Sequence, residues 1–342
     1  MRFGFIAHPG FKSPSLRHQW QGGRVSGHGH DGVDPPHTVE VADGVFAYVQ
    51  PDGSWWLNNS AFVVPRAPGN RVGSDGVVAV DATSTERRTR ALLAAIAAVS
   101  TAPTRVLVNT HHHGDHTNGN CLFTDATVIG HRNCRAGVAA QVIGGLDAVF
   151  GPVEWGELTI RPPEVVFDDR LDLYAGDRLI ELHHIGTPAH TTGDVVAWLP
   201  EDRLLLAGDL VFNGGTPFVL MGSVQGAIEA CARVRAFGAE TIVPGHGEPC
   251  GPEAIDTVER YLELVQLVAT EAHAAGVSPL DAARDTDLGV FADLHDAERI
   301  VGNLHRAMAE LAGAARGAPV DVPAAFADMM TFNGGGPLRC LA

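Results

Sequence analysis

The sequence predicts an α/β fold followed by a helical extension at the C-terminal end. Between about residues 39 and 250, short runs rich in β-branched residues alternate with helical stretches and turn signals. From about residue 252 the strand pattern stops and helical periodicity replaces it. The chain has 342 residues, of which 45% are hydrophobic, so it is long enough to bury a full core in one large domain or two.

The N-terminal part of the chain predicts a flexible segment and then paired strands. Residues 1–36 are rich in Gly, Pro, His and Arg and have no sustained periodicity, so we expect a flexible extension there. From Val39 the apolar alternation predicts paired strands, with Pro51-Asp52-Gly53 as a hairpin turn. A helix is expected at 85–99, where Thr85 precedes an Ala- and Leu-rich amphipathic run.

The remaining elements complete a core over residues 37–251 and an extension over residues 252–342. The core is expected to contain a helix near 223–237 and strands near 105–110, 126–130, 165–174, 179–185, 194–199, 203–208 and 240–244. The extension is expected to contain helices at 253–275, 279–287 and 295–313. We expect these helices to pack on the core rather than to form a separate catalytic domain.

The segment His111-His112-His113-Gly114-Asp115-His116 concentrates metal-ligand chemistry in six residues. It follows the apolar run 105–110, and ligands in α/β sheets bind beyond the carboxyl ends of strands. A zinc ion takes about four ligands, and the four candidates at 111, 113, 115 and 116 cannot easily all reach one ion. They can be shared between two ions held roughly 3.5–4 Å apart.

Four further motifs each present a metal-ligand type after an apolar strand or in a glycine-containing loop. They are Val77–Asp81 with Asp81, Gly186–Asp194 with His190, Leu204–Asp209 with Asp209, and Val243–Gly247 with His246. In order and spacing, over roughly residues 39–250, the five motifs resemble those of the metallo-β-lactamase superfamily. This resemblance implies an αββα sandwich of two mixed sheets flanked by helices.

The resemblance also implies a dinuclear site and a role for each residue. One metal would be held by His111, His113 and His190, and the other by Asp115, His116 and His246. Asp209 would bridge the two metals, and Asp81 would orient a ligand without binding metal. The implied cofactor is two zinc ions, with iron or manganese as alternatives, and a hydroxide between them would attack a carbonyl. Asp115 and Asp209 are the implied catalytic carboxylates.

Two details narrow the resemblance to particular groups within the superfamily. His116 and Asp209 together resemble glyoxalase II, lactonases and related thioesterases rather than the best-known zinc β-lactamases. Four runs, Pro51–Trp56, Asn109–Asn120, Phe218–Ser223 and Phe332–Gly335, resemble bacterial aromatic-polyketide cyclases. The narrower resemblance implies cyclisation and thioester release of a polyketide carried on an acyl carrier protein.

The expected substrate pocket is apolar or aromatic. Its candidate residues are Trp55, Trp56, Phe212, Phe218 and Met221, joined by apolar residues of the insertion 137–155. Candidates for holding the carboxylates of a glutathione thioester are Arg132, Arg135 and Arg161. Three alternatives stay open: a lactonase or glyoxalase II-like thioesterase, a mononuclear-iron oxygenase of the persulfide dioxygenase kind, and a binding protein with a degenerate site.

Composition argues against other classes. The net charge of −16 and the lack of a basic patch argue against a nucleic-acid substrate. No apolar run of 18 residues predicts a transmembrane helix, and the N-terminus has no signal-peptide pattern. The five cysteines are widely separated and include no C-x-x-C pair, so reduced thiols and a cytoplasmic location are expected. The oligomeric state is left open.

Overall fold

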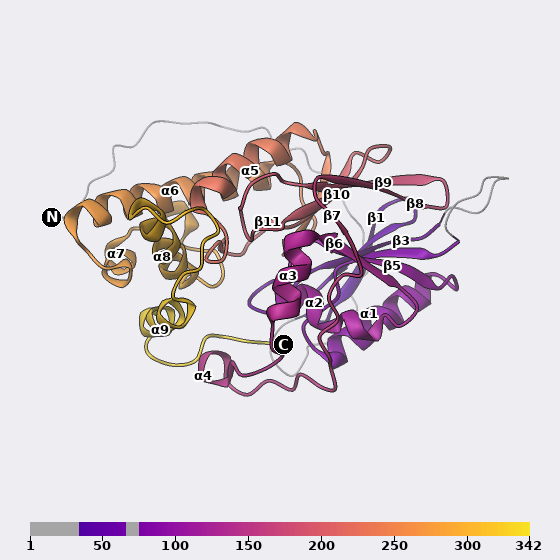
Figure 1. Ribbon diagram of the computed structural model, residues 1–342, viewed down its shortest axis with the longest axis horizontal. Helices are drawn as coiled ribbons and strands as arrows, with labels where there is room; N and C mark the ends of the chain where they lie inside the picture. The colour runs from indigo at the N-terminus through magenta and orange to yellow at the C-terminus, as the bar shows by residue number, and fades with distance from the viewer. Residues whose placement is uncertain (1–33, 66–74) are drawn as a thin grey trace.

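The computed structural model describes residues 34–65 and 75–342, and the flexible extension predicted for residues 1–36 therefore falls almost entirely outside the described residues. In the described part, a seven-stranded sheet and a five-stranded sheet stack on each other, with helices on both outer sides (Figure 1). The αββα sandwich expected from the resemblance is confirmed.

The first sheet has its strands in sequence order, β1 to β7. Strands β1 to β4 are antiparallel, and β4 to β7 are parallel. Their bounds are β1 His37–Ala42, β2 Val45–Val49, β3 Ser60–Val63, β4 Val77–Val80, β5 Thr104–Asn109, β6 Thr127–His131 and β7 Val165–Phe167. Helices α1 (Glu86–Val99) and α3 (Arg132–Ala140) connect its parallel strands, as parallel pairing requires a crossover. The helix predicted at 85–99 is confirmed, and Thr85 caps α1 by accepting the Arg88 N–H.

The second sheet has the order β12-β11-β10-β9-β8, with β11 and β12 parallel and the other pairs antiparallel. Its bounds are β8 Arg170–Ala175, β9 Arg178–His184, β10 Val195–Leu199, β11 Leu204–Phe212 and β12 Thr241–His246. The single strand predicted at 165–174 is wrong, because β7 and β8 belong to different sheets. The chain crosses between the sheets at Asp168 and Asp169, which are exposed and of a residue type that disfavours strands.

Strict alternation along the strands separates the core into layers. Val78 and Val80 of β4 point into the core between the sheets, whereas Val77 and Ala79 point toward α1. Leu204 and Leu206 of β11 likewise face the inter-sheet core, and Leu205 and Ala207 face the helical side. Strands buried on both faces read as continuous apolar runs, and this explains the sequence pattern at these positions.

The C-terminal helices cover the outer face of the second sheet and share one apolar cluster with β11. The C-terminal helices are α6 Glu253–Ala275, α7 Pro279–Asp285, α8 Arg299–Leu311 and α9 Val322–Phe332. Helix α5 (Val224–Ala236), which precedes β12, belongs to the same group. Helix α9 was not predicted. Shorter helical turns are α2 Gly114–Thr117, α4 Asp147–Phe150, η1 Asn118–Leu122 and η2 Gly289–Phe291.

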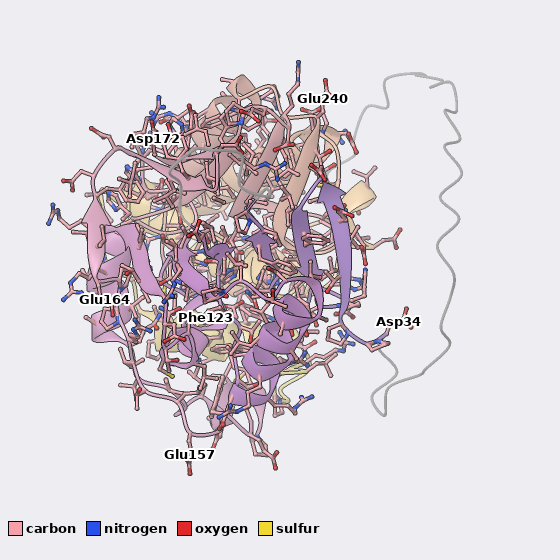
Figure 2. The ribbon with its side chains drawn as sticks, turned by 90° about the vertical axis from the view of Figure 1, so that its right-hand side faces the viewer. Asp34, Phe123, Glu157, Glu164, Asp172 and Glu240 are labelled. Atoms are coloured by element: carbon pink, nitrogen blue, oxygen red, sulfur yellow. The ribbon has the colours of Figure 1, made fainter. Side chains whose placement is uncertain are left out.

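Acidic side chains lie on the outside of the molecule. Figure 2 labels Asp34, Glu157, Glu164, Asp172 and Glu240 at the periphery, and all five are exposed. Within the described residues, no helix is both long enough and apolar enough to cross a bilayer.

Candidate metal centre

The residues predicted as metal ligands meet at one edge of the two sheets. Asp81 follows β4, and the segment 111–116 follows β5, the parallel neighbour of β4. Asp209 lies in β11 and His246 ends β12, which is parallel to β11. His190 lies in the loop between β9 and β10. The carboxyl ends of parallel strands share an edge, so both sheets deliver their polar residues to the same place.

Two groups of ligand atoms form there. In each group the atoms lie within 4.8 Å of one another; the groups are His111, His113, His190 and Asp209, and Asp115, His116 and His246. The Asp209 carboxylate touches both groups. Its Oδ2 lies 3.2 Å from His190 Nε2 and 3.3 Å from His246 Nε2, and its Oδ1 lies 3.1 Å from His116 Nε2. The structure thus brings all seven predicted residues together, with the Asp209 carboxylate between the two groups.

Hydrogen bonds at the far side of the imidazole rings fix their orientation. The ring atom Nδ1 faces an acceptor in four histidines: Thr110 Oγ1 for His111, Asp81 Oδ2 for His116, the Phe218 carbonyl for His190 and the Gly53 carbonyl for His246. In each case Nε2 is left facing the centre. His113 is reversed, with Nε2 at 3.3 Å from Met221 Sδ and Nδ1 at 2.8 Å from His190 Nε2. Such outer contacts are how proteins hold ligand histidines in one tautomer.

Asp81 lies where the resemblance places it, beside the ligands but outside both groups. Its carboxylate accepts the Thr110 N–H at 2.8 Å and lies 2.8 Å from His116 Nδ1. Its backbone has φ of 60°, a left-handed conformation that costs a non-glycine residue energy. The side-chain contacts to two partners hold Asp81 in this conformation.

The electrostatics suit cations. Burial and the neighbouring imidazoles lower the pKa of His111 and of His113 well below the usual range, so both are neutral at pH 7. Burial alone would lower the pKa of His246, but the carboxylates of Asp209 and Asp115 raise it to about 9. Burial opposes ionisation of Asp209, yet the surrounding imidazoles hold its pKa well below the usual range. Buried carboxylates thus face imidazoles that carry protons in the absence of metal.

These donors fit a metal pair. The buried Nε2 of His111 has no hydrogen-bond partner among the described residues, and buried polar atoms are rarely left without one. Neutral imidazole nitrogens and carboxylate oxygens are the ligands that zinc takes. The role of the seven residues as metal ligands stays a prediction, and the geometry supports it.

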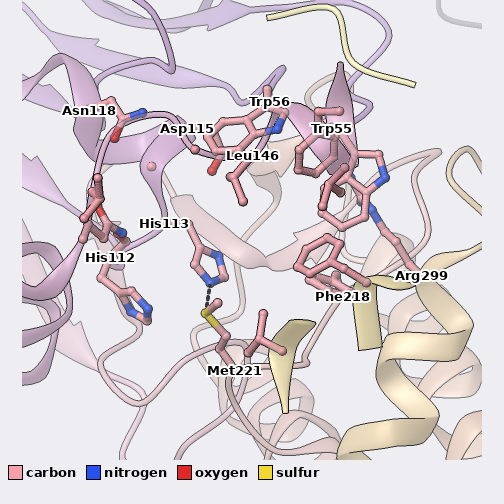
Figure 3. A pocket seen from close by; sticks show the side chains of 18 of the residues that line it. Trp55, Trp56, His112, His113, Asp115, Asn118, Leu146, Phe218, Met221 and Arg299 are labelled. Atoms are coloured by element: carbon pink, nitrogen blue, oxygen red, sulfur yellow. Dashed lines mark hydrogen bonds between the residues drawn. The ribbon is translucent and has the colours of Figure 1, made fainter. Parts of the chain in front are cut away.

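A cavity of about 740 Å³ opens directly onto the centre. His113, Asp115, His190, Asp209 and His246 line one side of it. All five predicted pocket residues, Trp55, Trp56, Phe212, Phe218 and Met221, also line it, together with Leu146, Val149 and Phe150 of the insertion. In Figure 3, His113 points toward Met221, and Trp55 and Phe218 lie together near Arg299.

The C-terminal extension supplies cavity residues that sequence reasoning missed. Helix α9 contributes Val322, Phe326 and Met330, and α8 contributes Arg299. Asp321 caps α9 by accepting the Ala324 N–H, and Pro323 lies in its first turn. This pattern could have predicted the helix. No local sequence pattern indicates that the apolar side of α9 faces the metal centre.

The buried Arg299 is held by its neighbours. Its guanidinium carbon lies 4.2 Å over the Trp55 ring, and Nη2 pairs with Asp296 at 2.9 Å. Among the described residues that line the cavity, Arg299 is the one Arg or Lys.

The three arginines considered for a glutathione carboxylate lie away from the cavity. Arg132 pairs with Asp168 at 2.9 Å, and Arg135 donates to the Pro163 carbonyl. Arg161 donates to the carbonyls of Phe123 and Ala126. All three therefore support surface loops.

The fold and site define a four-layer α/β protein with a two-part histidine–carboxylate centre. The sequence model of the Metallo-beta-lactamase superfamily matches residues 55–246, more than half of the chain, and the chain belongs to this superfamily.

Several known proteins are similar to this chain. A hydroxyacylglutathione hydrolase of Rhodospirillum rubrum is 33% identical over 140 residues, which are 40% of this chain and 45% of that protein. A linear primary-alkylsulfatase of a Pseudomonas species is 24% identical over 268 residues, covering 60% of this chain and 50% of that protein. The chain thus spans about half the length of the curated relatives it matches.

A solved structure, a metallo-beta-lactamase from Pontibacter korlensis, superimposes with a TM-score of 0.53 at 19% identity. It covers 67% of this chain and 99% of that one. This likeness confirms the fold. The family resemblance is confirmed as well, whereas the narrower resemblance to polyketide cyclases stays a prediction.

Proposed function

We propose that this protein is a two-metal hydrolase that cleaves thioesters of bulky apolar acyl groups. The observation that carries the proposal is the direct opening of the histidine–carboxylate centre onto a cavity of about 740 Å³ with aromatic and aliphatic walls. A cavity of this size accepts a whole small molecule, and its few polar groups converge on the centre. The reacting carbonyl would lie over the centre and the acyl group against the walls.

The chemistry divides between the bound metals and the chain. When bound, two metal ions would polarise the acyl carbonyl and lower the pKa of the attacking water. Asp115 and Asp209 stay ionised, because burial is outweighed by imidazoles that lower the pKa of both. Either carboxylate can therefore accept a hydrogen bond from the water and orient it for attack. The leaving thiol has a pKa of about 8.5, so it departs as thiolate and needs no proton donor.

The finer part of the proposal is that the acyl group is an aromatic polyketide precursor carried on an acyl carrier protein. Support comes from position: Trp55, Trp56, Phe218 and Met221, which belong to the runs resembling polyketide cyclases, all line the cavity. In such a reaction an enolate carbon bonds to a ketone carbon of the same chain, and water is lost. A second water then splits the C–S bond, giving an acid and a thiol.

A glutathione thioester is the second candidate, and the similarity to hydroxyacylglutathione hydrolases favours it. Glutathione carries two carboxylates, which need cationic partners. Arg299 is the one Arg or Lys lining the described cavity, and it is engaged with Asp296 and Trp55. The apolar walls therefore suit a bulky apolar acyl group better.

The experiment measures metal content first and substrate preference second. About two zinc ions per chain are expected, whereas one iron and no second metal would favour the oxygenase. Thiol release is then compared between an aromatic acyl thioester of N-acetylcysteamine and lactoylglutathione. The proposal expects at least tenfold higher kcat/KM for the aromatic thioester. The reverse preference would favour the glutathione reading. With a poly-β-ketone thioester, a product lighter by one water than the simple acid supports cyclisation.

A further inference from the structure

The segment 216–223 lines the cavity and supports the metal centre, but it has no regular secondary structure of its own. Its residues Phe218 and Met221 contact the centre from one side. The Phe218 carbonyl accepts the His190 Nδ1–H, and Met221 Sδ lies 3.3 Å from His113 Nε2. The position of this segment therefore bears on two predicted ligands of the first metal.

One face of α8 holds the segment. Arg299, Asn303 and Arg306 have the spacing i, i+4 and i+7, which places them on the same side of the helix. Arg299 Nη1 donates to the Thr216 carbonyl at 2.9 Å, and Arg306 Nε donates to the Leu220 carbonyl at 2.8 Å. Buried backbone groups outside helices and sheets need such partners.

Asn303 stands at the centre of this face and brackets Phe218. Its Nδ2 donates to the Pro217 carbonyl at 2.8 Å, and its Oδ1 accepts the Val219 N–H at 2.8 Å. The side chain is fully buried, so water cannot replace it. Both peptides that flank Phe218 are therefore fixed by one amide, and with them the direction of the Phe218 carbonyl.

Gly302 completes the arrangement. A Cβ at Gly302 would lie 2.7 Å from Phe218 Cε2, closer than real contacts allow. Glycine thus makes room for the Phe218 ring against α8, while the next residue holds its backbone.

We infer that Asn303 is a positioning residue for the metal centre: it fixes the Phe218 carbonyl that orients His190, so that His190 Nε2 faces the first metal. The inference deepens the proposed function and rests on its metal site. It makes α8, from outside the superfamily match at 55–246, part of the metal-binding machinery.

Two substitutions test it. Asn303→Ala removes both hydrogen bonds, and Asn303→Asp keeps the acceptor for the Val219 N–H but sets an oxygen against the Pro217 carbonyl. Chelator competition should show the affinity for one of two zinc ions falling at least tenfold in both variants, as for other partners of ligand histidines. The visible absorption of bound Co²⁺ should change with it, because it reports ligand geometry.

Two controls separate positioning from general stability. Tyr261→Phe removes a third, longer contact of Asn303, at 3.4 Å, and should leave both affinities unchanged. Leu304→Ala removes a fully buried apolar side chain from the same helix and should lower the melting temperature without selective metal loss. Wild-type affinities in both Asn303 variants would overturn the inference, as would equal loss of the same metal in Leu304→Ala.

The outcome is distinguishable from failure of the proposed function. The proposed function would be wrong and the inference would stand if the wild-type protein bound two zinc ions without hydrolysing thioesters while the Asn303 variants lost one metal selectively. If the protein hydrolysed thioesters and its metal affinity did not depend on Asn303, the proposed function would stand and the inference would be wrong. A wild-type protein that binds no metal would overturn both.

Discussion

Gly245 lies directly behind the carboxylate of Asp209, and its replacement by alanine tests whether the position of that carboxylate sets metal binding. A Cβ at Gly245 would lie 1.9 Å from Asp209 Oδ1 and 2.8 Å from the Asp209 backbone nitrogen. Strand β12 cannot easily retreat, because it pairs with β11 and the Gly245 carbonyl accepts the Asn59 N–H at 2.7 Å. The carboxylate must therefore move, and because the same Cβ would lie 2.7 Å from the Gly208 carbonyl carbon, the neighbouring backbone of β11 must shift with it.

The size of that movement sets the expected effect. Ordinary contact begins at 3.4 Å, so Asp209 Oδ1 must shift by roughly 1.5 Å, against a tolerance of about 0.2 Å in metal–ligand distances. We expect Gly245→Ala to lose at least one metal and most of its thioester hydrolysis. Crowding of a packed site should also cost about 1–3 kcal/mol of folding stability.

The assay is metal per chain by mass spectrometry after dialysis, with thermal unfolding in parallel. Gly336→Ala is the matched control, because an added Cβ there meets no described atom within 4 Å. The control should keep its metal and its melting temperature. Full metal content and wild-type hydrolysis in Gly245→Ala would refute the reasoning about Asp209.

Three further predictions concern the cavity wall, the ligand support and pH. Phe326→Ala should raise KM for aromatic acyl thioesters roughly tenfold and spare short acyl groups, since it removes apolar contact only; equal effects on both would contradict this. Asp81→Ala should weaken zinc about 10–100-fold in chelator competition by freeing His116; unchanged affinity would count against it. In metal-free protein the pKa of His246 is raised to about 9, so stability present below pH 6.5 should fall by about 3 kcal/mol as pH rises through 9. Urea unfolding at pH 6.5 and 9.5, with His246→Gln as reference, measures it, and equal stability would disprove it.

The metal centre was predictable because short segments of the sequence contain its candidate ligand residues. The segment 111–116 follows β5 and His246 ends β12, and parallel strands deliver their carboxyl ends to one edge of a sheet. Residues 111–116 carry most of the signal by themselves. The family resemblance, and no local pattern, placed Asp209 and His246 beside that segment, because β11 and β12 belong to the second sheet.

Other elements depended on tertiary contacts that no local pattern encodes. The turn expected at Pro51-Asp52-Gly53 is present, with the Gly53 N–H donating to the Gln50 carbonyl, and β2 and β3 pair antiparallel. The sequence did not indicate that the whole connection spans ten residues, 50–59, and Asn59 explains its length, since its side chain donates to the carbonyls of Pro244 and Gly247. The connection is thus tied to the end of β12 that carries His246. In the same way, Asn303 looks like any polar helix residue until its partners at 217 and 219 are known.

The predicted metal ligands and the apolar cavity wall belong to different elements of the fold. The predicted ligands come from strand ends and from loops anchored to both sheets, whereas much of the apolar wall comes from the insertion and α9. These two wall segments touch each other, because the Phe150 and Phe326 rings lie 5.9 Å apart, and the chain beyond α9 also reaches the insertion, where the Leu338 N–H donates to the Val149 carbonyl. Substitutions in this wall should therefore change substrate preference and leave metal content intact.

Segment 216–223 is where that separation breaks down, because Phe218 belongs to both parts. Its ring packs against Trp55 at 5.0 Å in the wall, while its carbonyl orients His190. Phe218→Ala keeps the carbonyl and removes the ring, so it should alter substrate preference and retain two metals. Asn303→Asp keeps the ring and disturbs the carbonyl, so it should weaken one metal in chelator competition. If Phe218→Ala changes only substrate preference and Asn303→Asp weakens only metal binding, then Phe218 positions the metal centre through its backbone and sets specificity through its side chain.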